Sequence, residues 1–278
     1  GSTEFHVWIL REAEAGLLTG TFFLYSNAGY KTLGLILERL LAQPIDQIMR
    51  ERLFEPLGMA ASQPVITHDT RRRLAVGYEA YYDDRPLPRG GLLAPATWLE
   101  DKGTDGAISS TAADMAAYVR LLLNRGQGPQ GRLLSEASFD LLTQPAIQPE
   151  DGEHGEFYGY GLNVGPVDGT HCLWHGGSMV GYRAMMQVDM DRGLGAVILA
   201  NGPSCHGEAS IDGLGRFALQ VLRAAHSGQE LPPPPAVDPF RIESAGEYAG
   251  TYAGGGGRLT FVAQDGGLHL LPAGGSIP

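Results

Sequence analysis

The chain has 278 residues, of which 43% are apolar, and a formal net charge of −11 at pH 7. This length and composition predict a globular protein with one large or two small domains. A negative charge without any basic run excludes the electrostatic footprint that nucleic acids and anionic membrane surfaces require. No apolar run reaches the roughly 20 residues that span a bilayer.

The first residues and the cysteines bear on processing and compartment. Residues 1–5 resemble a cloning-vector remnant, so we expect structure to begin at residue 6, with a helix over 6–15. Such a remnant replaces any native leader, and the compartment is therefore not predictable. Cys172 and Cys205 are too few for a disulfide framework, and one bridge or two free thiols are equally compatible with the sequence.

Two helices are predicted after Tyr25. Apolar residues recur every three or four positions from about residue 28 to 42, and Asn27 is placed to cap this helix. A second apolar stripe begins at Ile45, and we expect Pro56 with Gly58 to end it.

The apolar periodicity is lost in the middle of the chain and then returns. Residues 60–107 show no sustained period, so we expect loops and short strands there. Thr111 then opens a predicted helix that continues to about residue 124. Ser135 opens a shorter helix.

A change of period after residue 150 indicates strands. Four strand-like segments are separated by glycine, aspartate and proline turns, at 157–164, 171–175, 181–189 and 194–200. Short connections between successive strands predict an antiparallel meander. The amphipathic segment at about 208–226 is predicted to be a helix that covers one face of this sheet.

A proline-rich segment at 231–239 marks the sharpest boundary in the sequence. We therefore predict a main domain over 6–230 and a linker over 231–239. Residues 240–278 carry short strand signals but are too few to fold as an independent β domain. They are predicted to be the start of a small C-terminal β domain.

Common catalytic and metal motifs are missing from the sequence. There is no Gly-x-Ser-x-Gly, no phosphate-binding glycine loop followed by Lys-Ser/Thr, and no His-Glu-x-x-His. A metal site would have to use Cys172, His175, Cys205 and His206. Positions three apart on a strand face opposite sides, so Cys172 and His175 are poorly placed to share one ion. We expect no metal and no organic cofactor.

Two short motifs remain as candidates for chemistry. One is Tyr25-Ser26-Asn27 at a helix start, and the other is His175-Gly176-Gly177-Ser178 at the end of a strand. Each alone has an ordinary structural explanation. In that explanation, Asn27 is only a helix cap, Tyr25 is only an amphipathic residue at the border between core and solvent, and the glycines only form a turn.

Together and in this order, the motifs resemble those of the penicillin-recognising serine hydrolases, in the branch with class C β-lactamases, D-alanyl-D-alanine carboxypeptidases, D-aminopeptidases and esterases. The resemblance extends over most of residues 20–226, including FLYSNAGYKTLGLILERL, RLFEPLGM, GAISSTAADMAAYVRLLL, YGYGL and the segment from His175 to Asn201. It implies an α/β (α+β) fold of the serine β-lactamase type, with an antiparallel sheet flanked by helices and a helical subdomain.

The resemblance also implies roles for individual residues. Tyr25, held by the lysine of a Ser-x-x-Lys motif, would be the general base for the serine and the acid for the leaving group. Asn27 would bind the acyl-side amide of the substrate, and His175 would complete the proton network. The backbone N–H of Ser178 would donate to the oxyanion. The small residues Gly176–Gly177 would let the substrate backbone lie along the strand edge.

The nucleophile motif itself is absent. The only lysines are Lys31 and Lys102, and the residues three positions before them are Ala28 and Leu99. Only 24 residues precede Tyr25. We therefore expect an N-terminally truncated fold whose sheet has an open edge, and a chain that is inactive by itself.

The resemblance implies acyl transfer through a serine ester, on a small-molecule or peptide substrate that is a peptide, amide, β-lactam or ester. The alternative is a non-catalytic binding protein of the same fold. A third reading, in which an internal serine and a histidine form an unrelated triad, has no motif behind it. The sequence does not identify the substrate or the oligomeric state.

Overall fold

The computed structural model describes Trp8, Gly20 and residues 22–82, 92–149, 155–203, 210–235, 245–254, 257–264 and 266–271. The expected helix at 6–15 lies outside these residues, except for helical Trp8, and Cys205 also lies outside them. The chain forms two compact units: residues 1–80 with 93–233, and residues 81–92 with 234–278. Within the described residues, no helix combines the length and apolarity needed to cross a membrane.

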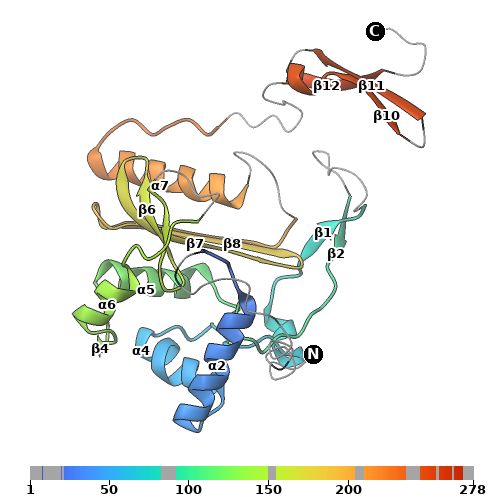
Figure 1. Cartoon of the computed structure of the whole chain (residues 1–278). Helices are drawn as coiled ribbons and strands as arrows, with labels where there is room; N and C mark the ends of the chain where they lie inside the picture. Colours follow the sequence, from blue (N-terminus) through green and yellow to red (C-terminus); the bar gives the residue numbers. More distant parts are fainter. Residues whose placement is uncertain are drawn as a thin grey trace. The chain divides into compact units, whose positions relative to one another are not determined.

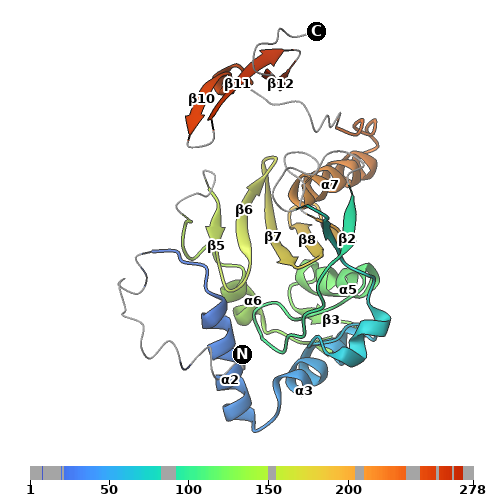
Figure 2. The same ribbon diagram turned by 90° about the vertical axis from the view of Figure 1, so that its right-hand side faces the viewer.

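The centre of the larger unit is a five-stranded antiparallel sheet in which neighbours in sequence are neighbours in space (Figure 2). Its strands, in order across the sheet, are β5 (Phe157–Tyr158), β6 (Asn163–Val167), β7 (Thr170–Met179), β8 (Tyr182–Asp189) and β9 (Leu194–Ala200). The predicted meander is confirmed.

Two strand boundaries differ from the prediction. The segment 157–164 was expected to be one strand, but it forms β5 and the start of β6, because Gly161 turns the chain with a φ of +80°. The strand expected at 171–175 continues to Met179, since the backbone after His175 pairs with β8 through to Tyr182.

Helices cover both faces of this sheet (Figure 1). On one face lies α7 (Ile211–Ser227), and on the other lie α5 (Ala112–Leu123) and α6 (Glu136–Leu142). A Cβ atom at Gly215 of α7 would lie only 2.7 Å from the Met185 side chain, and one at Gly195 of β9 only 2.4 Å from Val119 of α5. Glycine at these two positions therefore permits the close packing of helix on strand.

Side chains alternate between the two faces of β7 and divide the core accordingly. Leu173 belongs to a buried cluster with Leu122 of α5 and Phe139 of α6. Cys172 faces the opposite way and packs with Leu219 of α7. The first half of β7 is thus enclosed on both sides.

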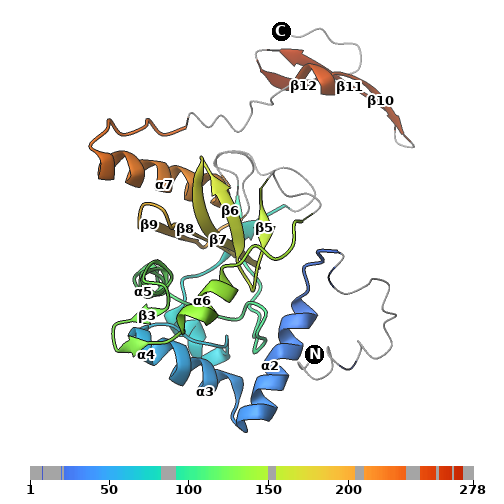
Figure 3. The same ribbon diagram turned by 60° about the vertical axis from the view of Figure 1, so that its left-hand side comes forward.

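A helical group lies on the same side of the sheet as α5 and α6 (Figure 3). It consists of α2 (Asn27–Leu41), α3 (Ile45–Met49), the π-helical η2 (Arg50–Phe54) and α4 (Glu55–Leu57). Gly58 ends the group with a φ of +70°, as expected. The predicted end of the helix is confirmed, because Leu57, directly after Pro56, is the last helical residue. Pro56 lies in the first turn of α4, where a residue without an N–H is tolerated.

The remaining described elements are short. The loop-rich segment 60–107 contains the 3-10 helix η3 (His68–Arg73) and the paired strands β1 (Tyr78–Ala80) and β2 (Leu93–Pro95). Further along the chain, β3 (Gln127–Gly128) and β4 (Gly131–Arg132) form a small hairpin. The smaller unit contains η5 (Ala245–Tyr248) and a three-stranded antiparallel sheet of β10 (Gly250–Gly254), β11 (Gly257–Gln264) and β12 (Gly267–Leu271). The domain boundary predicted at 231–239 stays a prediction.

Apolar surface and one sheet edge of the larger unit are uncovered in the part of the chain that the structure describes. β9 pairs only with β8, so the expected open edge is present. On α2, Leu33 is 53% exposed and Leu40 is 75% exposed. Apolar edges and patches of this kind are normally covered by another segment of polypeptide.

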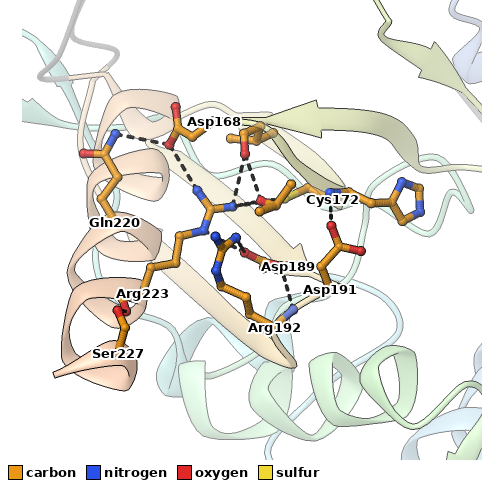
Figure 4. A network of polar contacts seen from close by, with 11 residues as sticks. Asp168, Cys172, Asp189, Asp191, Arg192, Gln220, Arg223 and Ser227 are labelled. Atoms are coloured by element: carbon orange, nitrogen blue, oxygen red, sulfur yellow. Dashed lines mark hydrogen bonds and ion pairs between the residues drawn. The ribbon is translucent and has the colours of Figure 1, made fainter. Parts of the chain in front are cut away.

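A buried ion pair joins α7 to the sheet (Figure 4). The carboxylate of Asp189, at the end of β8, is fully buried and accepts a hydrogen bond from Arg223 Nε at 2.7 Å. It also accepts from the Arg192 N–H at 2.9 Å. The guanidinium of Arg223 further donates to Asp168 on the β6–β7 turn, at 3.1 Å, and to Thr170. One helix residue therefore contacts three consecutive parts of the sheet.

The Asp189 carboxyl has a pKa below its ordinary value. Burial acts to raise this pKa, but the hydrogen bonds and charge of Arg223, together with the Arg192 N–H, outweigh burial. The ionised form is therefore favoured in the folded protein. This interaction stabilises the fold above the ordinary carboxyl pKa of about 3.9, and the stabilisation is lost as the pH falls through the lowered pKa.

We expect Asp189→Asn to lower the free energy of unfolding at pH 7 by about 1.5–3 kcal/mol, because Arg223 loses its buried charged hydrogen-bond partner and keeps only the more exposed Asp168 as counter-charge. The variant should also lack part of the decline in stability that the wild type shows below pH 4. Urea denaturation at pH 7 and at acid pH measures both effects. In the control Asp140→Asn, the exposed partner of Arg125 is lost, and the change should stay below about 1 kcal/mol. Equal losses in the two variants would contradict a structural role for the buried pair.

Candidate active site

Tyr25 immediately precedes helix α2, and its side chain is 52% exposed. The cap of this helix is Ser26, whose Oγ accepts a hydrogen bond from the Gly29 N–H at 3.1 Å. The prediction that Asn27 caps the helix is therefore wrong. Ser26 has the extended backbone of a cap residue, and Asn27 is the first helical residue. Asn27 is exposed and has no capping role.

The second motif lies on the half of β7 that extends beyond β6. Pairing of β6 with β7 stops at Trp174, whereas pairing with β8 continues to Met179. Among the described strands, none pairs with the other edge of β7 from Gly176 onward. Gly176, Gly177 and Ser178 are all exposed. This half of the strand therefore offers a sheet edge to which an extended substrate can bind.

The structure brings Tyr25 and His175 together, although 150 positions separate them in the sequence. Their ring centroids lie 6.3 Å apart. Tyr158 on β5 completes the cluster, with its centroid 6.3 Å from Tyr25 and 6.1 Å from His175. Phe23 packs against Tyr158 at 5.0 Å. The sequence predicted Tyr25 and His175 as site residues but not Tyr158, whose only signal was its place in the YGYGL segment.

Hydrogen bonds fix the orientation and tautomer of His175. Its Nδ1 lies 2.6 Å from the Gly176 carbonyl oxygen, which can only accept, so Nδ1 carries the proton. Nε2 of the neutral ring is then an acceptor. It lies 3.1 Å from the Tyr158 hydroxyl, which therefore donates to it. This assignment follows from the hydrogen-bond partners.

Tyr158 is suited to donate because its hydroxyl keeps its proton. Burial raises the pKa of Tyr158, and the nearby Tyr30 and Tyr25 hydroxyls raise it further. Burial likewise raises the pKa of Tyr30, which hydrogen-bonds to Tyr158. The Tyr158 hydroxyl donates in its hydrogen bond to His175. Tyr30, Tyr158 and His175 thus form a chain of hydrogen-bonded side chains.

The loop that precedes α5 contacts the Tyr30 backbone and the neighbouring Lys31 side chain. The Thr104 hydroxyl donates to the Tyr30 carbonyl oxygen at 2.5 Å. One residue further along α2, Lys31 forms a largely buried ion pair with Asp105 at 3.4 Å. These contacts join the start of α2 to the 101–106 loop. The position of the tyrosine chain is therefore set by contacts outside the two sequence motifs.

The part of the chain that the structure describes contains no group of three or more His, Cys, Asp and Glu side chains placed to hold a metal ion. Cys172 and His175 face opposite sides of β7, as the strand spacing predicted. Cys172 is a buried free thiol, and burial raises its pKa. It therefore behaves as a packing residue.

Comparison with known proteins adds independent information. The β-lactamase family model matches residues 10–220. Penicillin-binding protein 4 of Amycolatopsis lactamdurans is 31% identical over 242 residues, which are 85% of this chain and 61% of that protein. A D-aminopeptidase of Cereibacter sphaeroides is 28% identical, over 77% of this chain and 37% of its own length.

The fold is shared with a solved structure, the octameric penicillin-binding protein homologue from Pyrococcus abyssi. Its TM-score is 0.70 at 23% identity, over 97% of this chain and 57% of that one. The chain thus spans less than two thirds of the length of each of these relatives. With the family model matching about three quarters of the sequence, the chain belongs to the β-lactamase family of penicillin-recognising serine hydrolases.

Proposed function

We propose that this chain is the part of a serine hydrolase that supplies the proton-transfer residues and the substrate-binding strand. The reaction is acyl transfer to water through a serine ester, on a peptide, amide, β-lactam or ester. The observation that carries the proposal is the contact of Tyr25 with His175 beside the unpaired edge of β7. The names of two relatives, a penicillin-binding protein and a D-aminopeptidase, support substrates with an amide bond.

In the proposed reaction, Tyr25 accepts the proton of the nucleophilic serine and returns it to the leaving group. Its half-exposed side chain is accessible to a substrate. Asn27 binds the acyl-side amide, which its exposed position allows. The substrate lies along Gly176–Gly177, and the Ser178 N–H donates to the oxyanion.

His175 is proposed to complete the proton network in a fixed orientation. Its Nδ1–H is held by the Gly176 carbonyl and its Nε2 by the Tyr158 hydroxyl. We propose Tyr158 as a positioning residue, because it acts on the reaction only through the ring of His175. Fixed rings of this kind matter because small displacements of proton-transfer groups lower rates strongly.

The nucleophile and its lysine are proposed to come from polypeptide outside the 278 residues. No Ser-x-x-Lys occurs in the sequence, and the chain spans 61% of the penicillin-binding relative. The exposed apolar face of α2 and the open edge of β9 support this view, because both suit a covering segment. The rival proposal is a binding protein of the same fold without a nucleophile.

We expect the chain alone to form no covalent adduct with benzylpenicillin and to leave a chromogenic cephalosporin intact. Tyr25 and His175 supply proton transfer but no activated nucleophile. Intact-mass spectrometry after incubation with excess penicillin should show the unmodified mass. A stoichiometric adduct on any serine of this chain would contradict the assignment of the nucleophile to another segment.

In a parent protein that carries Ser-x-x-Lys, Tyr25→Phe should lower the acylation rate by about 10² to 10⁴, the range typical of acid–base groups. The thermal midpoint should change little, because the ring is retained. Stopped-flow acylation and thermal melting measure the two effects. The control Tyr160→Phe removes another exposed hydroxyl and should leave both unchanged. An unchanged acylation rate in Tyr25→Phe would show that Tyr25 only lines the site and takes no part in proton transfer.

Tyr158→Phe should change the environment of His175 while keeping the ring that packs on Phe23. In the ¹⁵N-labelled chain, the Nε2 resonance of His175 should move because its hydrogen-bond donor is lost. The same substitution in an active parent should lower kcat more than it raises KM. Tyr160→Phe should leave the His175 resonance in place. An unmoved resonance in Tyr158→Phe would exclude the positioning role.

A further inference from the structure

Tyr30 lies in the first turn of α2, five residues after Tyr25 and outside both sequence motifs. Its side chain is half-buried, and its hydroxyl is hydrogen-bonded to Tyr158 on β5. Tyr158 in turn donates to His175. Because Tyr25 immediately precedes α2, Tyr30 connects the helix that places Tyr25 with the strand whose tyrosine holds His175.

The backbone of Tyr30 is held on both of its polar groups. Its N–H donates to the Ser26 carbonyl at 3.3 Å, which continues the capped start of the helix. Its carbonyl accepts a hydrogen bond from the Thr104 hydroxyl. Thr104 also packs against Gly34, one turn further along α2, where an added Cβ atom would lie 2.5 Å from the threonine oxygen. The start of α2 is therefore held closely against the loop before α5.

The turn between β5 and β6 contacts the other end of the Tyr30 side chain. Figure 2 shows this hairpin above the start of α2. An added Cβ atom at Gly161 would lie 3.0 Å from the Tyr30 hydroxyl oxygen, so the backbone of the turn packs directly on that hydroxyl. The turn is closed by the Gly159 N–H, which donates to the Leu162 carbonyl at 2.8 Å. The hairpin therefore fixes where the hydroxyl lies.

The chemistry of Tyr30 suits a residue that places other groups and does not itself take a proton. Burial raises the pKa of Tyr30 above its ordinary value, so the hydroxyl keeps its proton at neutral pH. Its partner Tyr158 has its ring centroid 6.3 Å from that of Tyr25 and 6.1 Å from that of His175. A displacement of Tyr158 would therefore change its contacts with both candidate proton-transfer residues.

We infer that Tyr30 is a positioning residue, whose hydroxyl joins α2 to the β5–β6 hairpin and so fixes Tyr25 relative to Tyr158 and His175. This role rests on the proposed function, in which Tyr25 and His175 transfer protons. A shift of the hairpin against α2 would misplace these two groups without removing either, and small displacements of this kind lower catalytic rates strongly. If the ring of Tyr30 only filled space, its hydroxyl would be dispensable.

Tyr30→Phe tests the hydroxyl in the chain as it exists, because it keeps the ring. In the ¹⁵N-labelled chain, the Nε2 resonance of His175 should move, though by less than in Tyr158→Phe, since the Tyr158 hydroxyl loses only the partner that fixes it. Tyr118→Phe is the matched control, because Tyr118 is also half-buried but packs in the core from α5, and it should leave the resonance in place. Thermal midpoints verify that the variants are folded. An unmoved resonance in Tyr30→Phe overturns the inference.

A double-mutant cycle tests whether Tyr30 acts on His175 through Tyr158. In a Tyr158→Phe background the link between helix and hairpin is already broken, so adding Tyr30→Phe should move the His175 resonance no further. Residues that act through one network are non-additive in this way, whereas independent residues add. Additive shifts in the double variant would show that Tyr30 reaches His175 by another route, and they would overturn the inference.

The catalytic consequence is tested in a parent protein that carries Ser-x-x-Lys. Tyr30→Phe should lower kcat by about five- to tenfold, the effect of one net hydrogen bond, while KM changes little and Tyr118→Phe leaves both constants unchanged. An unchanged kcat in Tyr30→Phe overturns the positioning role. A wild-type parent that hydrolyses no amide or ester refutes the proposed function instead, whereas the coupling of Tyr30 to His175 is decided by the resonances of the isolated chain.

Discussion

The antiparallel pairing of β7 with β8 sets the position of the candidate site. Eight residue pairs, from Cys172 opposite Asp189 to Met179 opposite Tyr182, run without a break from the buried core to the exposed edge. The core half is enclosed between α7 and α5, so the strand direction is fixed by packing. The exposed half continues in the same direction, and this fixes the positions of His175 and the following glycines.

The buried pair of Asp189 and Arg223 stabilises the core end of this strand pair. Arg223 contacts the end of β8 and, through Asp168 and Thr170, the turn that leads into β7. Ion pairs of this kind tie elements together even where their net contribution to stability is small. At the opposite end, the turn between β7 and β8 packs against Gly77 and Ala96. The strand that carries the candidate site is thus held at both ends, which suits a rigid scaffold for site residues.

Much of this arrangement was predictable from the sequence, because it depends on local signals. The period of α2, the cap residue Thr111 and the strand signals after residue 150 gave the correct order of helices and strands. Asn27 was mistaken for the cap because serine and asparagine are equally good cap residues, and only the backbone conformation of Ser26 decides between them.

Tyr158 was missed for a different reason. Its role depends on the hairpin that brings β5 against the start of α2, and on partners 17 and 128 positions away, His175 and Tyr30. No spacing rule relates such residues. The pairing of Tyr25 with His175 was expected from the family resemblance alone, since periodicity says nothing about contacts across 150 residues.

The central proposal is that this chain forms one side of a serine hydrolase site whose nucleophile belongs to another segment. Its most direct test is to label the product of the full coding sequence with a fluorescent penicillin and to map the labelled peptide. We predict that the label lies outside these 278 residues, on a serine followed three positions later by lysine, and that Tyr25→Phe slows the labelling. A label on a serine within this chain, or a complete gene product that takes no label, would contradict the account.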